Sequence, residues 1–521
     1  MSRTDAGTPL TREQQRLSRN VALVAASFAL AALMGLLRNV IIARRFGIGA
    51  ELDVYYAAFR WPDLLFAVLA GGALATAFIP VFAGVAALGQ REAAWRLTSQ
   101  VTNWAVLVVG SLAALSAIFA PWLVANTAAP GFSPAQQAQT AAAMRLVLIS
   151  TVIFSISSVQ TSALNGLKHF FWPSLAPVVY PLGVIIGAVW LTPTWGVRGL
   201  AAGAVLGSLF HLLVKVPALR AYGFRWWPVL DPDDHALRRV AVLMLPRIAD
   251  LGLFHLTVLV TTNLASQLAT GSVSALEWGW DAMQLPETVI GTAFGLVAFP
   301  TLAELAAVGD RPGLCRTLVV SLRTVIALAL PATIALLILG RPLLAMVYQR
   351  GAFGETDTAA VFTALRFYAL GLTAHACLEL AARAFFAQED TITPLLIAAV
   401  FAGTNIALGI VLMRPLGAAG LALANSLAVS GEVVALLWIL RRRLGGIDAR
   451  SLASALGRVG LASAAMAVSM IAVLGLAVQH SVPTAPAIVM AALGGLATYL
   501  VALRLVHVRE VELLVAALYR R

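Results

Sequence analysis

The chain has 521 residues, of which 60% are hydrophobic and only 12% are charged. A soluble globular protein carries about 25% charged residues, so the composition excludes an ordinary soluble enzyme and favours a protein with many membrane spans. The formal net charge of +12 does not indicate nucleic-acid binding, because the basic residues lie mainly in short segments between apolar runs, where anionic lipids are the expected neighbours.

The apolar runs predict an all-α polytopic membrane protein with about 14 transmembrane helices. The first 20 residues are a polar tail. The apolar run from Val21 is longer than the core of a signal peptide, so we interpret it as an uncleaved first span. We expect spans near residues 21–46, 54–87, 97–125, 141–165, 174–193, 196–217, 239–268, 274–307, 317–339, 358–386, 392–413, 416–440, 453–478 and 484–506.

The loops predict the orientation of these spans. An even number of spans puts both termini on one side of the membrane. The loops on that side contain most of the arginines, including Arg441, Arg442 and Arg443, whereas the opposite loops 126–140 and 268–273 contain almost no charge. Because basic loops stay in the cytoplasm, we predict cytoplasmic termini in a cytoplasmic (inner) membrane protein.

A weak internal repeat divides the chain. Residues 218–238 look like a cytoplasmic linker between an N-terminal six-helix bundle (21–217) and a C-terminal one (239–440). FRWPDLLFAVLAGGALATAFIPVFA in the second span is echoed by QLPETVIGTAFGLVAFPTLA in the eighth. Equivalent spans run in the same direction, which predicts a parallel repeat with a substrate site between the halves. The last segment, 441–521, adds two extra spans and a tail.

Arginines within spans are candidate anion ligands. An arginine at mid-bilayer costs about 2.5–3.5 kcal/mol on insertion scales, so it is expected to face a cavity, an ion partner or an interface. Arg38 lies about 17 residues into the first span. Arg60 with Asp63, and Arg247 with Asp250, are spaced i,i+3, which suits a structural pair as well as a substrate site.

Acidic residues in the eighth span are candidate ion-coupling groups. Glu277, Asp281 and Glu287 have no basic residue between them, and the first two repel each other at i,i+4 unless a cation or proton is bound. The alternative is that one of them lies among headgroups. Glu379 and Arg383 in the tenth span are most simply an internal salt bridge. No metal or cofactor is expected, because the two cysteines, Cys315 and Cys377, suggest no metal site or disulfide.

An enzyme is the rival class of protein. Asp231 and Asp233 form an Asp-x-Asp pair, but the loop that carries them is too short for a nucleotide-binding domain, and no Walker A motif or nucleophile elbow occurs. A membrane-embedded glycosyl- or phosphotransferase, or a scaffold for one, would be favoured by a large external loop with paired carboxylates, which is not seen. We therefore predict a transporter and not an enzyme.

Several segments resemble the MurJ/MviN lipid II flippase family of the MOP exporter superfamily. They are LLRNVIIARRFGIGAELDVYYAAFRWPDLL, ALNGLKHFFWPSLAPVVYP, TGSVSALEWGWDAMQLPETVIGTAFG and FFAQEDTITP. The resemblance implies a cavity between two bundles that opens alternately to each side. It also implies transport of an undecaprenyl-pyrophosphate-linked disaccharide-pentapeptide, and a groove for the lipid tail on the last two helices.

The resemblance also assigns site residues. Arg38 matches a cavity arginine of the family, Asn39 stands where an acidic residue is common, and Asp53 matches the pattern. The chain departs from the family in having Ala32, Ala67 and Ala282 at positions that are often arginine, and Gly72 at a position that is often acidic.

The sequence thus predicts a lipid II flippase that works by alternating access. The predicted substrate-binding residues are Arg38, Asn39, Asp53, Arg60, Asp63 and Arg247, and the predicted ion-coupling residues are Glu277, Asp281 and Glu287. Alternatives are an exporter of another polyprenyl-linked glycan and a multidrug-type antiporter of the same superfamily. Expected partners are a polyprenyl-pyrophosphate-linked glycan lipid, membrane lipids, and a monovalent cation or proton. The predicted state is a monomer, with cell-wall synthesis proteins as further partners.

Overall fold

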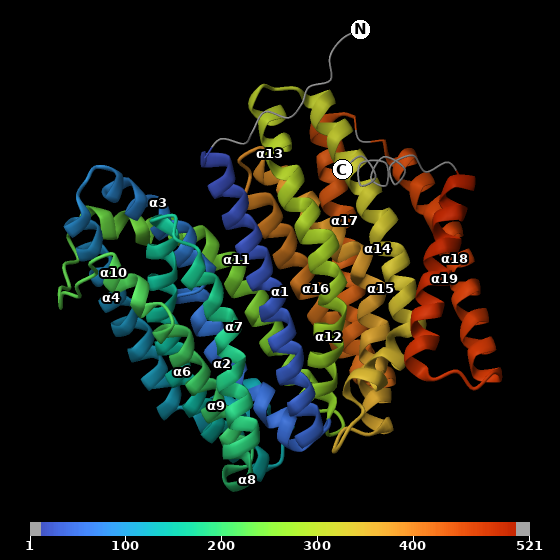
Figure 1. Cartoon of the computed structure of the whole chain (residues 1–521), viewed down its shortest axis with the longest axis horizontal. Helices are drawn as coiled ribbons and strands as arrows, with labels where there is room; N and C mark the ends of the chain where they lie inside the picture. The colour runs from blue at the N-terminus through green and yellow to red at the C-terminus, as the bar shows by residue number, and fades with distance from the viewer. Residues whose placement is uncertain (1–11, 447, 507–521) are drawn as a thin grey trace. The chain divides into compact units, whose positions relative to one another are not determined.

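The computed structural model describes residues 12–446 and 448–506, and every regular element in these residues is a helix, which confirms the all-α prediction (Figure 1). Most of the predicted polar tail, and the basic residues Arg509, Arg520 and Arg521, lie outside the described residues. The described part contains 14 helices long and apolar enough to cross a membrane. Most of their bounds lie within a few residues of the predicted ones.

Long helices alternate with short irregular turns in the first half of the chain. Its elements are α1 (Arg12–Phe46), α2 (Ala50–Leu69), α3 (Gly72–Ala87), α4 (Arg91–Ile118), α5 (Ala120–Leu123), the π-helix η1 (Val124–Ala128), α6 (Pro134–Gly166), α7 (Phe171–Ile186), the π-helix η2 (Gly187–Leu191), α8 (Thr192–Trp195), α9 (Val197–Leu213), α10 (Val216–Ala221) and α11 (His235–Ser266).

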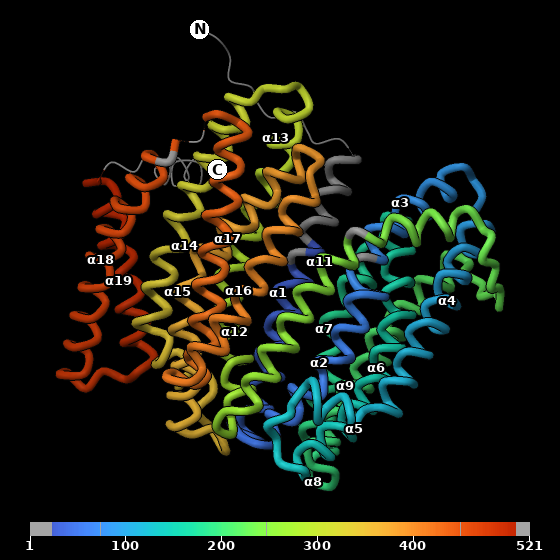
Figure 2. The backbone as a smooth tube through the Cα atoms, turned by 180° about the vertical axis from the view of Figure 1, so that it is seen from behind, coloured from blue at the N-terminus to red at the C-terminus, as the bar shows by residue number. Residues whose placement is uncertain are grey.

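The second half is built in the same way. Its elements are α12 (Ser272–Glu287), the π-helix η3 (Thr288–Thr292), α13 (Ala293–Ala307), α14 (Arg311–Tyr348), α15 (Glu355–Phe386), α16 (Ile392–Leu416), α17 (Ala418–Leu444), α18 (Ala449–Gln479) and α19 (Thr484–Leu505). The last two helices lie side by side at the red end of the chain (Figure 2).

The helices form two compact units. Unit 1 consists of residues 1–45 and 57–259, and unit 2 consists of residues 46–56 and 260–521. This division falls inside α11, about 20 residues beyond the predicted linker 218–238. It also assigns the short segment 46–56, from the end of α1 into α2, to unit 2. The two compact units therefore do not follow the predicted bundle limits closely, and the internal repeat stays a prediction.

Small residues allow close packing inside unit 1. α7 packs along α9, and a Cβ added at Gly203 in α9 would lie only 2.7 Å from the Cα of Gly187. Such glycine contacts bring helix backbones together where lipid offers no hydrophobic driving force. In unit 2, Gly279 of α12 lies against Ala364 and Leu365 of α15 in the same way.

Local sequence signals fix where several helices begin. Ser133 and Gln136 form a capping box at the start of α6, with Ser133 N–H donating to Gln136 Oε1 at 3.0 Å. The carboxylates of Asp310 and Asp448 accept from backbone N–H groups at the starts of α14 and α18. Each cap satisfies a backbone donor that the first turn of a helix leaves without a partner.

The second and eighth spans are both interrupted, as their matching sequences predict. The second span breaks at Ala70 and Gly71, between α2 and α3, and the eighth passes through the π-helix η3. A π-helical turn inside an α-helix is frequently found at a functional site. The interruptions occur in the two segments that carry most of the predicted site residues.

Two turns at matching places in the predicted repeat share one backbone geometry. Lys168 follows α6 and Glu389 follows α15, and both adopt a left-handed backbone conformation, with φ of 58° and 60°. In each turn the next residue donates its N–H to a carbonyl five residues earlier: His169 to Leu164, and Asp390 to Phe385. This helix-ending motif usually places glycine at the left-handed position, so its shared use of a charged residue supports the predicted repeat.

Candidate functional site

Arg38 of α1 is oriented by its neighbour in the chain. Its Nε and Nη2 atoms both donate to the side-chain oxygen of Asn39, at 3.0 and 2.9 Å. The Asn39 amide is neutral, so it orients the guanidinium and adds no negative charge. A carboxylate at this position would add one. The predicted pair Arg38 and Asn39 therefore forms a positioned cation in unit 1.

A second group of charges in unit 1 comes from α2. The charges of Arg38 and Asp63 both act on the Tyr180 hydroxyl in α7, so three helices contribute to one polar region. Arg60 is buried and its charge acts on His255 of α11. The sequence analysis did not single out Tyr180. A tyrosine between two prolines in an apolar span, as in VVYP, is the signal that could have found it.

Arg247 and Asp250 form a local ion pair on α11. Arg247 Nη1 lies 2.6 Å from Asp250 Oδ2, and about half of each side chain is exposed. The i,i+3 spacing that suggested a pair in the sequence therefore gives one. A pair this exposed contributes little to stability, about 0–1 kcal/mol, and its arginine already has a counter-ion.

Asp53 is buried in unit 2, where it caps a helix. Its carboxylate accepts hydrogen bonds from Gly271 N–H at 2.6 Å, from Ser274 N–H at 2.8 Å and from the Ser274 hydroxyl at 2.7 Å. These groups lie at the start of α12, where a negative charge complements the helix dipole. Asp53 is only 2% exposed, so in this structure its carboxylate contacts protein groups.

Further contacts fix the segment 46–56 within unit 2. Tyr56 Oη accepts from Trp278 Nε1 at 2.7 Å, and a Cβ added at Gly47 would lie 2.6 Å from the carbonyl oxygen of Ala352. Gly47 has φ of 63°, so both its conformation and this close approach require glycine. The segment is held at both ends.

The acidic residues of the eighth span do not lie alone. The charges of Glu287 and Glu379 act on each other, and Arg383 Nη2 pairs with Glu379 Oε2 at 3.0 Å. Glu287 Oε1 lies against Gly291 in η3, and the Arg383 side chain lies across Gly295 of α13. Two acidic groups and one arginine thus gather around the π-helix. Glu277 and Asp281 lie partly buried on α12, before Glu287.

The sequence analysis treated Glu379 only as a salt-bridge partner of Arg383. The structure adds its interaction with Glu287, which lies 92 positions earlier and could not be inferred from spacing within one helix. The signal available in the sequence was an excess of acidic residues in the eighth span. No group of three potential metal ligands gathers in the described residues.

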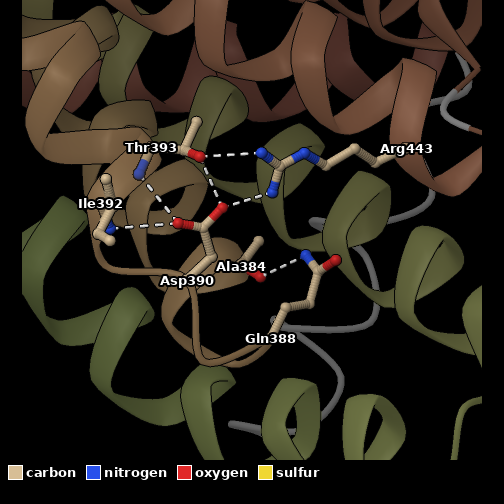
Figure 3. A network of polar contacts seen from close by, with 6 residues as sticks. All are labelled: Ala384, Gln388, Asp390, Ile392, Thr393 and Arg443. Atoms are coloured by element: carbon tan, nitrogen blue, oxygen red, sulfur yellow. Dashed lines mark hydrogen bonds and ion pairs between the residues drawn. The ribbon is translucent and has the colours of Figure 1, made fainter.

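The FFAQEDTITP turn is fixed by a polar network in unit 2 (Figure 3). Asp390 accepts from the N–H groups of Ile392 and Thr393 at the start of α16, and from Thr393 Oγ1 at 2.6 Å. Arg443, in the last turn of α17, donates to Asp390 at 2.5 Å and to Thr393 Oγ1 at 2.8 Å. The network ties the α15–α16 turn to the end of α17.

The ionisation of Asp390 follows from these contacts. Burial opposes the charged form, but the hydrogen bonds from Thr393 and Arg443 and the Arg443 charge outweigh it, so the pKa of the Asp390 carboxyl is lowered to about 2. Arg443 also lies over the Phe385 ring, 5.3 Å from its centroid. Asp390 is therefore ionised at any working pH.

Comparison with known proteins places this architecture in a family. The family model for "Lipid II flippase MurJ" matches residues 42–494. The chain is 30% identical over 419 residues to a probable lipid II flippase MurJ of Rhizobium meliloti, covering 78% of this chain and 76% of that protein. It is also 30% identical over 442 residues to a lipid II flippase MurJ of Burkholderia cenocepacia, covering 83% and 84%.

Solved structures have the same fold. A structure titled "Lipid II flippase MurJ, inward closed conformation" matches with a TM-score of 0.77 at 23% identity, covering 92% of this chain and 98% of that one. An inward-facing multidrug resistance transporter of the MATE family in the MOP superfamily matches with a TM-score of 0.67 at 14% identity, covering 80% and 95%. The matching family model spans most of the chain, and the chain is a multi-pass membrane protein that belongs to the lipid II flippase MurJ family.

Proposed function

We propose that this protein moves lipid II, an undecaprenyl-pyrophosphate-linked disaccharide-pentapeptide, to the outer leaflet of the cytoplasmic membrane by alternating access. The observation that carries the proposal is the family match over residues 42–494. The relatives in Rhizobium meliloti and Burkholderia cenocepacia carry the same function in their names. Both termini lie in the cytoplasm in this proposal, and the protein is a transporter with no catalytic activity of its own.

Arg38 is the proposed ligand of the pyrophosphate. A guanidinium fork matches phosphate oxygens and stays charged at any working pH. Asn39 supports the role because it orients Arg38 through two hydrogen bonds. Arg60 and Asp63 supplement this site from α2. Arg247 is a weaker candidate ligand of the pyrophosphate, because its charge is paired with that of Asp250.

Asp53 acts on the substrate indirectly in this proposal. Its carboxylate is fully engaged with Gly271 and Ser274, so it positions the start of α12 rather than binding the lipid headgroup in the described conformation. A substrate contact would require those three hydrogen bonds to open.

Ion coupling is assigned to the acidic residues of the eighth span, Glu277, Asp281 and Glu287. The charge of Glu379 acts on Glu287, and this closeness of two acidic groups supports a site that takes up a proton or a monovalent cation. The lipid tail is assigned to α18 and α19. A monomer that associates with cell-wall synthesis proteins completes the proposal.

Depletion of the protein in its native host tests the function. Lipid-linked precursors are extracted and identified by mass spectrometry, and we expect lipid II to accumulate on the cytoplasmic side. Accumulation of a different polyprenyl-linked glycan would favour the second candidate, an exporter of that glycan. This second candidate is favoured by three alanines, Ala32, Ala67 and Ala282, because the resemblance to the MurJ/MviN family leads to arginines at these positions. No accumulation of any lipid-linked glycan would contradict both.

A further inference from the structure

Lys215 is a fully buried amine near the end of a span. It lies between α9 and α10, where the sixth span approaches its end, and it is 0% exposed. A lysine in this position ordinarily extends its ammonium outward to the interface. Here Nζ reaches Ser157, nine residues before α6 ends at Gly166, or about 13 Å along that helix. The amine is therefore held inside unit 1.

The amine is surrounded by uncharged oxygens. Lys215 Nζ lies 2.6 Å from the Ser157 carbonyl oxygen, 2.6 Å from Ser157 Oγ and 2.8 Å from Thr161 Oγ1. Among the described residues, no carboxylate forms an ion pair with it. An internal ammonium without a counter-ion is costly unless its donors are all satisfied, and three acceptors are the number that an ammonium requires.

Ser157 connects this amine to a second base. Its Oγ lies 2.7 Å from His211 Nδ1, so one hydroxyl bridges Lys215 and His211. Thr161 Oγ1 already donates its hydrogen to the Ser157 carbonyl at 3.0 Å, and it can only accept from Lys215. The remaining choice concerns the Ser157 hydroxyl, which can point to His211 or to Lys215.

Each choice satisfies every atom of the bridge. When Ser157 donates to His211 Nδ1, Lys215 is an ammonium with three donated bonds and His211 is neutral. When Ser157 donates to Lys215, the amine is neutral, and His211 is an imidazolium that donates from Nδ1 to Ser157 Oγ. The two arrangements differ by the position of one proton.

We propose that Lys215, Ser157 and His211 form a proton-binding relay inside unit 1. A proton leaves Lys215 Nζ for Ser157 Oγ while the hydroxyl proton of Ser157 passes to His211 Nδ1. Serine is neutral before and after the step, one N–H bond breaks and one forms, and no other reactant is needed. The ligand of this site is a proton, and the site is separate from the acidic residues of the eighth span.

The surroundings of the relay contain few other charges. The Phe154 ring of α6 lies between His211 and Tyr180: its centroid is 5.1 Å from that of His211 and 5.3 Å from that of Tyr180. The charges of Arg38 and Asp63 act on Tyr180, which belongs to α7. The relay thus lies next to the region of the proposed pyrophosphate ligand. On the helices packed around it, the remaining charged groups near helix ends are Arg91, Glu92, Arg96, Arg198 and Arg220, and Arg145 lies 12 residues before Ser157 on α6.

The chain allows a direct measurement of the proton. It contains only two lysines, Lys168 and Lys215, so the exposed Lys168 is changed to arginine and a single lysine Nζ signal remains. The full-length protein is labelled with ¹⁵N-lysine and ¹⁵N-histidine in phospholipid bilayers and followed by solid-state NMR across a pH series. His211→Gln identifies the His211 resonances.

The relay predicts that the NMR signals of Lys215 and His211 change in one shared pH transition. The pair holds one proton in either arrangement. Its release as the pH rises therefore changes the Lys215 Nζ and His211 Nδ1 signals together, with a common midpoint. Ser157→Ala keeps both bases but removes the bridge, and the two midpoints separate by about one pH unit or more. Two independent midpoints in the protein with Ser157 intact overturn the relay, and this measurement needs no further variant to fold.

Ser162→Ala is the matched control. Ser162 is also buried on α6, and its hydroxyl donates only to the Ser158 carbonyl at 2.9 Å, outside the relay. We expect the shared midpoint to remain in this variant. Separation of the midpoints in Ser162→Ala as well as in Ser157→Ala would show a general disturbance of α6 and would contradict the bridging role of Ser157.

The link to transport rests on the proposed function. In proteoliposomes, an imposed pH gradient is expected to accelerate lipid II translocation by the unaltered protein. Ser157→Ala is expected to lose this acceleration, measured as the ratio of its rates with and without the gradient. Acceleration that survives in Ser157→Ala would overturn a role of the relay in coupling. Absence of lipid II translocation under any gradient speaks against the proposed function, and the NMR midpoints then decide the relay on their own.

Discussion

Arg38 donates from both Nε and Nη2 to one acceptor, the side-chain oxygen of the adjacent Asn39. The cation is therefore oriented by a neutral group. The chain has Ala32, Ala67 and Ala282 where the resemblance to the family leads to arginines, so the proposed binding of an anionic headgroup would depend heavily on Arg38.

Arg38→Lys is expected to lose much of the transport activity, because a point charge cannot reproduce the guanidinium fork. Arg38→Ala should lose more, by about 10- to 100-fold if hydrogen bonds worth about 1.5–3 kcal/mol are removed. Asn39→Asp should also weaken transport by neutralising Arg38. The measurement is complementation of a flippase-depleted strain, normalised to membrane abundance.

Arg145→Ala is the control for this series, because Arg145 is an exposed arginine that donates to the Ala117 carbonyl at 2.9 Å. It should complement normally. Normal activity of Arg38→Ala at normal abundance would remove the main residue-level support for a pyrophosphate-lipid substrate and would favour the multidrug-type alternative.

The Asp53 cap predicts an order of stabilities. Ser274→Ala removes one side-chain hydrogen bond and should cost about 1 kcal/mol. Asp53→Ala also leaves the buried N–H groups of Gly271 and Ser274 without their acceptor, and should cost about 1–3 kcal/mol. Thermal unfolding of the purified protein measures both. Glu51→Ala, an exposed acidic position in the same turn, should change little, and equal effects of Asp53→Ala and Glu51→Ala would refute the capping role.

The Asp390 network predicts a pH window. Its pKa is lowered from an ordinary value of 3.8 to about 2, so its stabilising contribution is complete above about pH 4 and is lost as the pH falls through about 2. Asp390→Asn should therefore lower stability by a constant amount, about 0.5–1 kcal/mol for this partly exposed ion pair, at every pH from 5 to 8. A stability difference that varies across that range would be inconsistent with an ionised Asp390.

The basic loops predict the orientation. Reporter fusions at Arg16 and Arg520 should both report a cytoplasmic location, and a fusion within residues 126–140 should report the opposite side. The last fusion serves as an internal control, because it must differ from the other two. Termini found on opposite faces would rule out the 14-span arrangement.

The extra helices are predicted to act on the lipid tail. α18 and α19 both pack on α14, and Tyr499 Oη donates to the Ala327 carbonyl at 2.5 Å. A protein that ends near Gly446 should still insert but should lose lipid-substrate transport. The control is truncation after Val506, which keeps both helices and should retain activity. Full complementation by the shorter protein would show that α18 and α19 do not form the tail groove.

The sequence analysis succeeded where local pattern determines structure. The spans were predicted from apolar runs, because each run is a signal that lies within about 20 residues. The i,i+3 spacing of Arg247 and Asp250 likewise gave a real ion pair. Such features depend on the geometry of one helix.

Contacts between distant helices were not predictable in the same way. Lys215 and Ser157 are 58 positions apart, and nothing in the residues around either one indicates the other. The charges of Arg38 and Asp63 both act on Tyr180 only because the fold brings residues of α1, α2 and α7 near one another. The sequence indicated that Asp53 matters, but its partners at Gly271 and Ser274 depend on the tertiary fold.

The position of Asp53 has a consequence for biogenesis. Its partner Gly271 lies 218 residues later in the chain, and the segment 46–56 belongs to a unit that otherwise begins at residue 260. At a synthesis rate of about 5–20 residues per second, the segment leaves the ribosome roughly 10–40 s before its partners exist. During that interval Asp53 has no helix to cap, and the insertion machinery must accommodate the carboxylate. Slowing translation between residues 60 and 270 should therefore prolong crosslinking of Asp53 to insertion factors.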